Sequence, residues 1–194
     1  MEKFVNAIVK LDNIKQWEER DAEVKESVSQ HSFKSATIAV YLSKVLCKEE
    51  VDKDMQSFFN DCIIFALLHD FDEAILGRDI GHMVKYNEYN GDKIRSVLND
   101  YVDMEMKTNY PVIMDSMKPT CDVKLFCKLI DWFCQLIFIE RNAKMGCNAF
   151  QHERDYCISN IRQKIAEVVS MFKNKFDKDI ESELNVIFNP WIKK

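Results

Sequence analysis

Apolar positions along the chain recur mostly at helical spacing. Between residues 31 and 46 they fall three or four apart, and Ser29 is placed to cap the start of that helix. A run of seven apolar residues, 62–68, could by itself be a buried strand, but its length together with the preceding residues favours a helix over 54–69. The same spacing predicts further helices over residues 2–11, 86–106, 121–143, 149–175 and 178–187.

No stretch alternates apolar and polar residues convincingly with a period of two, so we predict an all-α fold. Gly77 and Gly81 bracket one connecting loop, and Pro111 and Pro119 mark a second connecting region. The chain has 194 residues, with no internal repeat and no linker-like stretch. This length and organisation predict one domain over residues 1–194.

Composition narrows the possible classes of protein. Four glycines and three prolines leave too few tight turns for a β-sandwich or a barrel. With 47% hydrophobic and 30% charged residues the chain is not disordered, and a net charge of −5 argues against DNA or an anionic membrane as the main partner. The most apolar stretch, near 125–139, contains Lys128, Asp131 and Gln135 and is too polar to span a membrane.

The seven cysteines are odd in number and none is spaced C-x-x-C, so neither a disulfide framework nor a zinc ribbon is indicated. We expect free thiols that act as small core residues in a reducing cytoplasm. The N-terminal residues lack the apolar run of a signal peptide, which agrees with a cytoplasmic protein.

Three sequence positions carry candidate metal chemistry. His69 and Asp70 follow directly after the apolar run of the helix over 54–69. Asp131 lies within an apolar helix, where an ionised carboxylate costs several kcal/mol to bury unless a cation compensates it. Taken singly, His69 suits a helix C-terminus and Asp131 suits pairing with Lys or Arg.

The fourth candidate, His31, stands 38 residues before His69, and Asp131 stands 61 residues after Asp70. This helical H…HD…D pattern resembles the HD-domain phosphohydrolase superfamily. The resemblance implies a single HD-domain helical bundle around a metal site whose ligands are His31, His69, Asp70 and Asp131. Two imidazoles and two carboxylates suit one divalent ion such as Mn, Co, Zn, Ni or Fe, with positions left for water and a phosphate oxygen.

Further motifs resemble the bacterial HD-domain 5′-deoxynucleotidases within this superfamily. They are Trp17, placed 14 residues before the first His, and His69-Asp70-x-x-Glu73, Gly77 with Asp79, and Val84-Lys85-Tyr86. The resemblance is strongest over residues 1–145, and we expect the helices of residues 146–194 to pack on this part. A related branch, often viral, hydrolyses deoxynucleoside triphosphates, notably dATP, and would use the same residues.

The resemblance also implies roles for the other residues. Glu73 matches the catalytic acid/base carboxylate. The alternatives are that Glu73 is a solvated surface carboxylate, or that Asp72 takes the acid/base role in its place. Asp79 matches a catalytic carboxylate that contacts the sugar or assists the leaving group. Trp17 matches an aromatic side chain that packs on the deoxyribose or the base and disfavours a 2′-hydroxyl, with plain core packing as its alternative. Lys85 matches a phosphate-side lysine, with a solvated surface lysine as its alternative.

One departure from the family pattern concerns the phosphate. The family usually has Arg directly before that Trp, whereas this chain has Gln16. Arg20, Lys25 or Arg78 are the cations that could replace it. The segment Gly77-Arg78-Asp79-Ile80-Gly81 also places Asp79 one residue further from Glu73 than is usual. His82 falls in this altered loop, and we expect it at the surface.

The sequence therefore predicts a metal-dependent 5′-deoxynucleotidase that releases phosphate from deoxynucleoside monophosphates. The alternatives are a dNTP triphosphohydrolase, with additional Mg on the polyphosphate; a cyclic-nucleotide or (p)ppGpp hydrolase; and a metal-holding HD binding module without activity. We expect a deoxynucleotide as the small-molecule partner, no stable nucleic acid or membrane partner, and a homo-oligomer. We expect a cytoplasmic location, which for a viral protein is the cytoplasm of the host cell.

Overall fold

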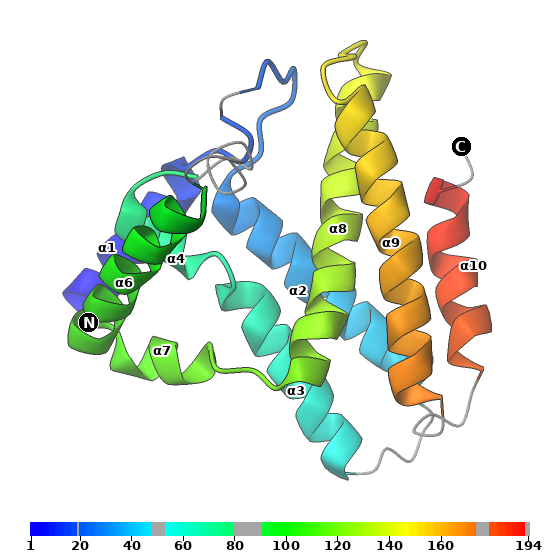
Figure 1. The fold of residues 1–194 in the computed structure, drawn as a ribbon, viewed down its shortest axis with the longest axis horizontal. Helices are drawn as coiled ribbons and strands as arrows, with labels where there is room; N and C mark the ends of the chain where they lie inside the picture. The colour runs from blue at the N-terminus through cyan, green and yellow to red at the C-terminus, as the bar shows by residue number, and fades with distance from the viewer. Residues whose placement is uncertain (19, 48–52, 80–90, 174–178, 193–194) are drawn as a thin grey trace. The chain divides into compact units, whose positions relative to one another are not determined.

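The structure is a computed structural model, and it describes residues 1–18, 20–47, 53–79, 91–173 and 179–192. Within these ranges the chain forms helices, and its only β-type pairing is an isolated antiparallel bridge between Lys15 and Ser27. The all-α prediction is confirmed. The helices are α1 (Glu2–Asn13), α2 (Val28–Leu46), α3 (Lys53–Leu68), α4 (Phe71–Leu76), α6 (Gly91–Asn109), α7 (Pro111–Ser116), α8 (Cys121–Lys144), α9 (Gln151–Phe172) and α10 (Ile180–Ile192) (Figure 1).

Several helix boundaries differ from the prediction. The two six-residue helices α4 and α7 were not predicted, since fewer than two turns give no readable apolar period. Pro111, read as part of a connection, is the first residue of α7, a position where a helix needs no backbone N–H. The last helix was predicted to end at 187, but α10 continues through Pro190 to Ile192 because the buried i, i+4 series also continues to Ile192.

The described helices fall into two compact units, each made of two separate stretches of the chain. The first comprises residues 1–32 and 68–118, and the second comprises residues 33–67 and 119–194. Helix α2 begins in the first unit and continues in the second. The prediction of a single domain over residues 1–194 stays a prediction.

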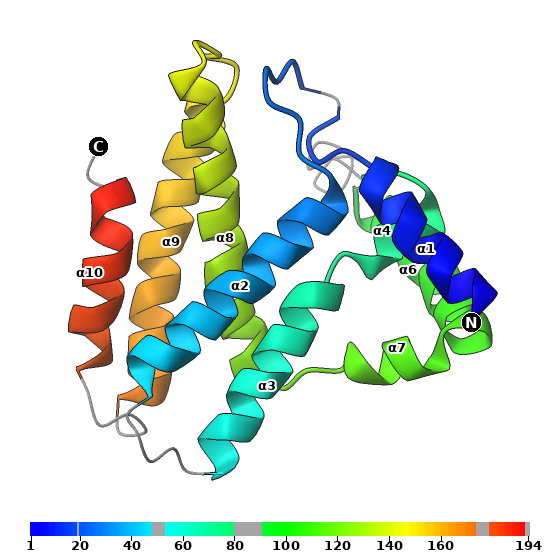
Figure 2. The same cartoon turned by 180° about the vertical axis from the view of Figure 1, so that it is seen from behind.

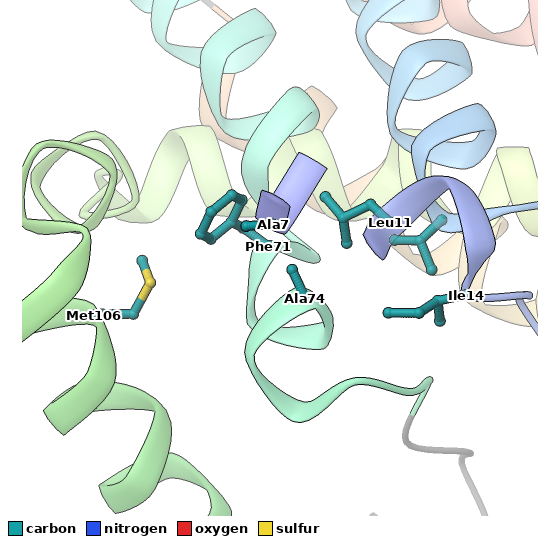
Figure 3. Close-up of a cluster of buried hydrophobic side chains, with 7 residues drawn as sticks. Ala7, Leu11, Ile14, Phe71, Ala74 and Met106 are labelled. Carbon is teal, nitrogen blue, oxygen red and sulfur yellow. The ribbon is translucent and has the colours of Figure 1, made fainter. Parts of the chain in front are cut away.

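The first unit is built around a small apolar core between α1 and α4, with α6 against α4. Phe71 and Ala74 of α4 face Ala7 and Leu11 of α1, as Figure 3 shows. Phe71 also stacks on Phe4, with ring centroids 6.2 Å apart, and meets the ring of Tyr110 edge-on. Burying Phe71 fixes the start of α4, and therefore the two residues that precede it.

The second unit is centred on α8. Helix α9 packs along α8, and α10 packs on α9, so the three helices lie side by side in both views (Figures 1 and 2). The rings of Phe58, Phe126 and Phe172 join α3, α8 and α9, with centroids 5.0 to 6.4 Å apart. The C-terminal helices α9 and α10 thus supply much of the apolar surface that buries α8.

None of the described helices combines the length and apolar character that crossing a bilayer requires.

Every cysteine is a free thiol, as expected from the spacing. The contact with the Cys127 thiol, followed by burial, raises the pKa of the Cys62 thiol far above its ordinary value.

Candidate functional site

His31 is held at the start of α2 by a reciprocal hydrogen-bonded cap. The Gln30 backbone N–H donates to Ser27 Oγ at 3.2 Å, and the Ser27 N–H donates to Gln30 Oε1 at 2.9 Å. This is a Ser-x-x-Gln capping box, so the helix is capped by Ser27, and the prediction that Ser29 is the cap was wrong. The physical reason is the partner three residues on, which is Gln for Ser27 and Ser32 for Ser29. His31 follows in the first turn and is 3% exposed.

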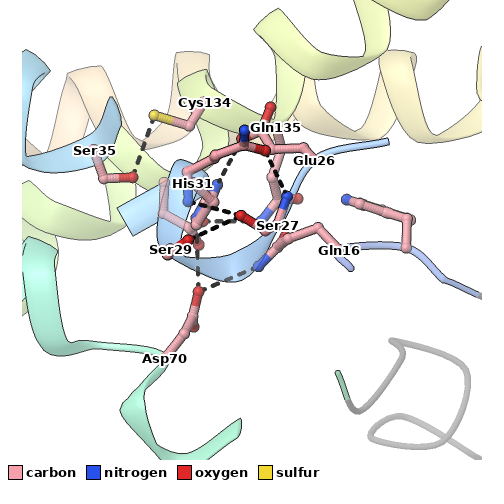
Figure 4. Close-up of polar contacts among 12 residues, drawn as sticks. Gln16, Glu26, Ser27, Ser29, His31, Ser35, Asp70, Cys134 and Gln135 are labelled. Atoms are coloured by element: carbon pink, nitrogen blue, oxygen red, sulfur yellow. Dashed lines mark hydrogen bonds and ion pairs between the residues drawn. The ribbon is translucent and has the colours of Figure 1, made fainter. Parts of the chain in front are cut away.

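His69 and Asp70 lie in the turn between α3 and α4. The His69 Nε2 atom lies 3.1 Å from Asp70 Oδ2, and the same oxygen lies 3.8 Å from His31 Nε2. The rings of His31 and His69 have centroids 5.3 Å apart. Two imidazoles and one carboxylate of the predicted ligand set therefore come together within the first unit. Figure 4 shows the Asp70 carboxylate directed at His31.

Two further side chains approach this group. Glu26 is 5% exposed, and its Oε1 atom lies 3.9 Å from His31 Nδ1, on the far side of the ring from Asp70. Gln16 donates a hydrogen bond from Nε2 to Asp70 Oδ2 at 3.3 Å. Sequence reasoning missed Glu26, because it lies outside a helix among other charged residues and no periodicity marks it as buried.

Glu73 lies in the first turn of α4, three residues after Asp70, and is 2% exposed. Its backbone N–H donates to the Asp70 carbonyl oxygen at 3.1 Å. The alternative of a solvated surface carboxylate is therefore wrong. Asp72, the competing carboxylate, is only half-buried.

Asp131 belongs to the second unit, in the middle of α8, and is 8% exposed. Lys128 Nζ lies 2.5 Å from its Oδ2 atom, and Gln135 Nε2 donates to its Oδ1 atom at 3.1 Å. The Lys partner that the sequence left open is thus present, one turn earlier on the same helix. The Lys128 side chain is half exposed, so its ammonium group remains in contact with water.

The predicted substrate residues are only partly brought together. Trp17 is half-buried in the turn after α1, and its backbone N–H donates to Asp79 Oδ2 at 2.8 Å. Arg20 is half-buried in the same turn, whereas Arg78 and Lys25 are exposed. Lys85 and His82 lie outside the described residues.

The donor set fits a divalent transition metal. Imidazole nitrogens and carboxylate oxygens are ligands for Mn, Fe, Co, Ni and Zn, and here His31 and His69 direct Nε2 atoms toward one oxygen of Asp70. A carboxylate beside the other nitrogen of a ligating imidazole is a common device for fixing the ring orientation, and Glu26 is placed for it.

Comparison with known families is decisive for classification. The family model described as "5′-deoxynucleotidase YfbR-like" matches residues 3–180. The chain belongs to this family of 5′-deoxynucleotidases. It is therefore a metal-dependent phosphohydrolase of deoxynucleoside monophosphates, and the predicted family, enzyme class and reaction are confirmed.

Solved structures agree on the fold of this family member. A protein of Pyrococcus horikoshii OT3 superposes with a TM-score of 0.68 at 17% identity, covering 99% of this chain and 98% of that one. An HD-domain phosphohydrolase of Listeria innocua superposes with a TM-score of 0.63, also at 17% identity, covering 99% and 97%. No curated protein matches the sequence significantly.

Proposed function

We propose that His31, His69, Asp70 and Asp131 hold one divalent metal ion and that this centre releases phosphate from deoxynucleoside 5′-monophosphates. The observation that carries the proposal is the convergence of His31, His69 and Asp70 within a chain that matches the nucleotidase family. Asp131 enters the proposal as the helix-borne carboxylate that the resemblance implies, and it is buried in α8 with 8% exposure. When bound, such an ion acidifies a water molecule and polarises the phosphoryl oxygens.

Glu73 is the group that we propose for proton transfer. It lies one helical turn after Asp70 and is almost completely buried, so bulk water does not compete for its proton. From there its carboxylate orients the attacking water, accepts its proton and delivers a proton to the leaving 5′-oxygen of the nucleoside. Asp72, which is more exposed, has no such role in this proposal.

The substrate is proposed to lie beside the turn after α1. Trp17 supplies an aromatic surface for the deoxyribose, and Arg20 is the cation in the same turn. Because Gln16 is neutral and donates to Asp70, the phosphate charge falls to the metal and to cations such as Arg20, Arg78 and Lys85. The assignment of these cations, and of a homo-oligomeric state, stays a prediction.

Product analysis tests the reaction. Purified protein is incubated with Mn²⁺ or Co²⁺ and with matched dNMPs, NMPs and dNTPs, and the products are separated by ion-exchange chromatography. The expected result is nucleoside plus phosphate from dNMPs. Nucleoside plus tripolyphosphate from a dNTP would instead establish the triphosphohydrolase alternative, and no turnover of any substrate would overturn the proposal.

The ligand set is tested separately by metal content. Replacing His31, His69 or Asp131 by Ala is expected to abolish both stoichiometric metal and turnover. His152→Ala and Asp155→Asn change exposed residues of the same types and serve as matched controls. Retention of full metal content in Asp131→Ala would remove Asp131 from the ligand set. Comparing activity after reloading with Mn, Co, Zn, Ni or Fe identifies the preferred metal.

A further inference from the structure

Trp17 has a backbone conformation that a bulky residue rarely adopts. Its φ angle is +57°, in the left-handed region, and among the described residues no other non-glycine has a positive φ. Contact between the side chain and the backbone disfavours this region for residues with a Cβ atom. Such a conformation persists only where surrounding contacts determine it.

Backbone hydrogen bonds hold the chain on the N-terminal side of Trp17. The Gln16 N–H donates to the Glu26 carbonyl oxygen at 2.9 Å, and the Val28 N–H donates to the Ile14 carbonyl oxygen at 3.0 Å. Residues 14–16 are thereby paired with the segment that leads into α2. The pairing ends at Gln16, so it leaves the orientation of the next peptide plane to other contacts.

Two contacts fix the orientation of the peptide plane between Gln16 and Trp17 and of the plane that follows Trp17. The Trp17 N–H donates to Asp79 Oδ2 at 2.8 Å, and the Trp17 carbonyl oxygen accepts from the Arg20 N–H at 2.8 Å. The second contact is local and closes the turn. The first reaches across 62 residues and ends on a carboxylate, which is a stronger acceptor than a neutral oxygen.

Asp79 is itself placed by the end of α4. Gly77 terminates this helix with φ +74°, and its N–H donates to the Glu73 carbonyl oxygen at 2.7 Å. The left-handed glycine turns the chain away from the helix axis, and Asp79 follows two residues later. Helix α4 therefore connects three functional positions: Asp70 before it, Glu73 in its first turn and Asp79 after it.

We infer that Asp79 is a positioning residue that holds Trp17 in its left-handed conformation and thereby sets the preference for deoxyribose over ribose. The inference rests on the proposed role of Trp17 at the sugar. The Asp79 Oδ2 atom accepts a hydrogen bond from the main-chain N–H of Trp17, and this role requires no proton transfer. Without this acceptor Trp17 relaxes toward negative φ, the direction of its Cα–Cβ bond changes, and the indole moves.

The first test needs no substrate. The chain has three tryptophans, so ¹⁵N-tryptophan labelling yields three backbone amide signals, and the one missing in Trp17→Phe belongs to residue 17. In Asp79→Ala the exchange of this amide with solvent is expected to accelerate ~10-fold or more. In Asp79→Asn, whose carboxamide oxygen still accepts from the N–H, exchange stays within ~3-fold of wild type. Unchanged exchange in Asp79→Ala overturns the inference.

The second test compares kcat/KM for a dNMP and its ribonucleotide counterpart. Asp79→Ala and Trp17→Ala are each expected to reduce this ratio ~10-fold, and the double variant to lose no more than the larger single effect. Asp79→Asn, whose carboxamide oxygen still accepts from the Trp17 N–H, is expected to keep the ratio. If Asp79→Asn loses kcat as Asp79→Ala does while the ratio stays intact, Asp79 handles a proton instead and the inference is overturned.

Controls separate this inference from the proposed function and from misfolding. Asp12→Ala removes an exposed carboxylate of α1 and should change neither readout. Asp79→Asn can still form the hydrogen bond with the Trp17 N–H. A folding defect confined to Asp79→Ala is therefore recognised by comparing the two variants. A wild-type protein that hydrolyses no nucleotide overturns the proposed function and the sugar preference together, whereas the exchange experiment still decides whether Asp79 holds Trp17.

Discussion

Gln16 donates a hydrogen bond from its Nε2 atom to Oδ2 of Asp70, 3.3 Å away and 54 residues along the chain. The same oxygen faces His31 and His69. A neutral amide thus touches the carboxylate that we propose as a metal ligand, at the position where the resembling nucleotidases carry a phosphate-binding Arg. Gln16 orients Asp70 without adding a positive charge that would compete with a metal.

Replacing Gln16 should therefore weaken metal binding more than it weakens the fold. Gln16→Leu keeps most of the side-chain volume and removes the hydrogen bond to Asp70. We expect the affinity for Mn²⁺ to fall ~10-fold or more, as for other groups that orient metal ligands. Metal titration against activity, with thermal unfolding of the metal-free protein in parallel, measures both effects. Unchanged affinity would mean that Asp70 is oriented by other contacts.

Glu73 and Asp72 are neighbours in α4 with different burial, which makes them a matched pair. Glu73→Gln should lower kcat by ~10²–10⁴-fold, the usual contribution of a general acid/base, while metal content is retained. Asp72→Asn should stay within ~3-fold of wild type, because Asp72 is less buried than Glu73 and we assign it no proton-transfer role. The reverse order of effects would transfer the proton-handling role to Asp72.

The capping box at the start of α2 predicts a stability effect. Ser27→Ala removes the side-chain acceptor for the Gln30 N–H and should lower the free energy of unfolding by about 1 kcal/mol. Because His31 lies in the same turn, the affinity for metal should fall as well. Urea unfolding of the metal-free protein measures the first effect. Ser43→Ala, which changes a half-buried serine near the end of α2, is the control, and an equal loss there would contradict the cap.

The buried thiol of Cys157 predicts a loss of stability in alkali. Burial, with a smaller contribution from the charge of Asp131, raises the pKa of Cys157 to about 12. In the unfolded chain a thiol ionises near pH ~8.5, so between these two values the unfolded state releases a proton that the native state keeps. The free energy of unfolding therefore falls as pH rises, by up to about 1.4 kcal/mol per pH unit from this group.

Unfolding free energies measured from pH 8 to pH 10.5 test this dependence. Cys157→Ala should flatten the slope, whereas Cys121→Ala, which removes an exposed thiol, should leave it unchanged. Equal slopes in wild type and Cys157→Ala would show that the native thiol ionises as readily as the unfolded one.

The long helices and the metal-ligand residue types were readable in the sequence, because both are local properties. Apolar spacing repeats over several turns in α2, α8 and α9, and a carboxylate in the apolar run around Asp131 stands out without any knowledge of its neighbours. The short helices α4 and α7 lack that repetition. The cap at Ser27 is also a local signal, since Gln30 follows it by three residues, whereas Ser29 has no such partner.

The contacts among these residues were decided only by the tertiary structure. The packing of Phe71 and Ala74 against α1 fixes α4 and the chain around it. Three contacts depend on this placement: Glu26 beside His31, Gln16 with Asp70, and Asp79 with the Trp17 backbone N–H. Sequence by itself determined an all-α chain with the ligand chemistry of a metal-dependent nucleotidase. Which atoms meet was set by packing between segments far apart in the chain, since local propensity carries no information about such distances.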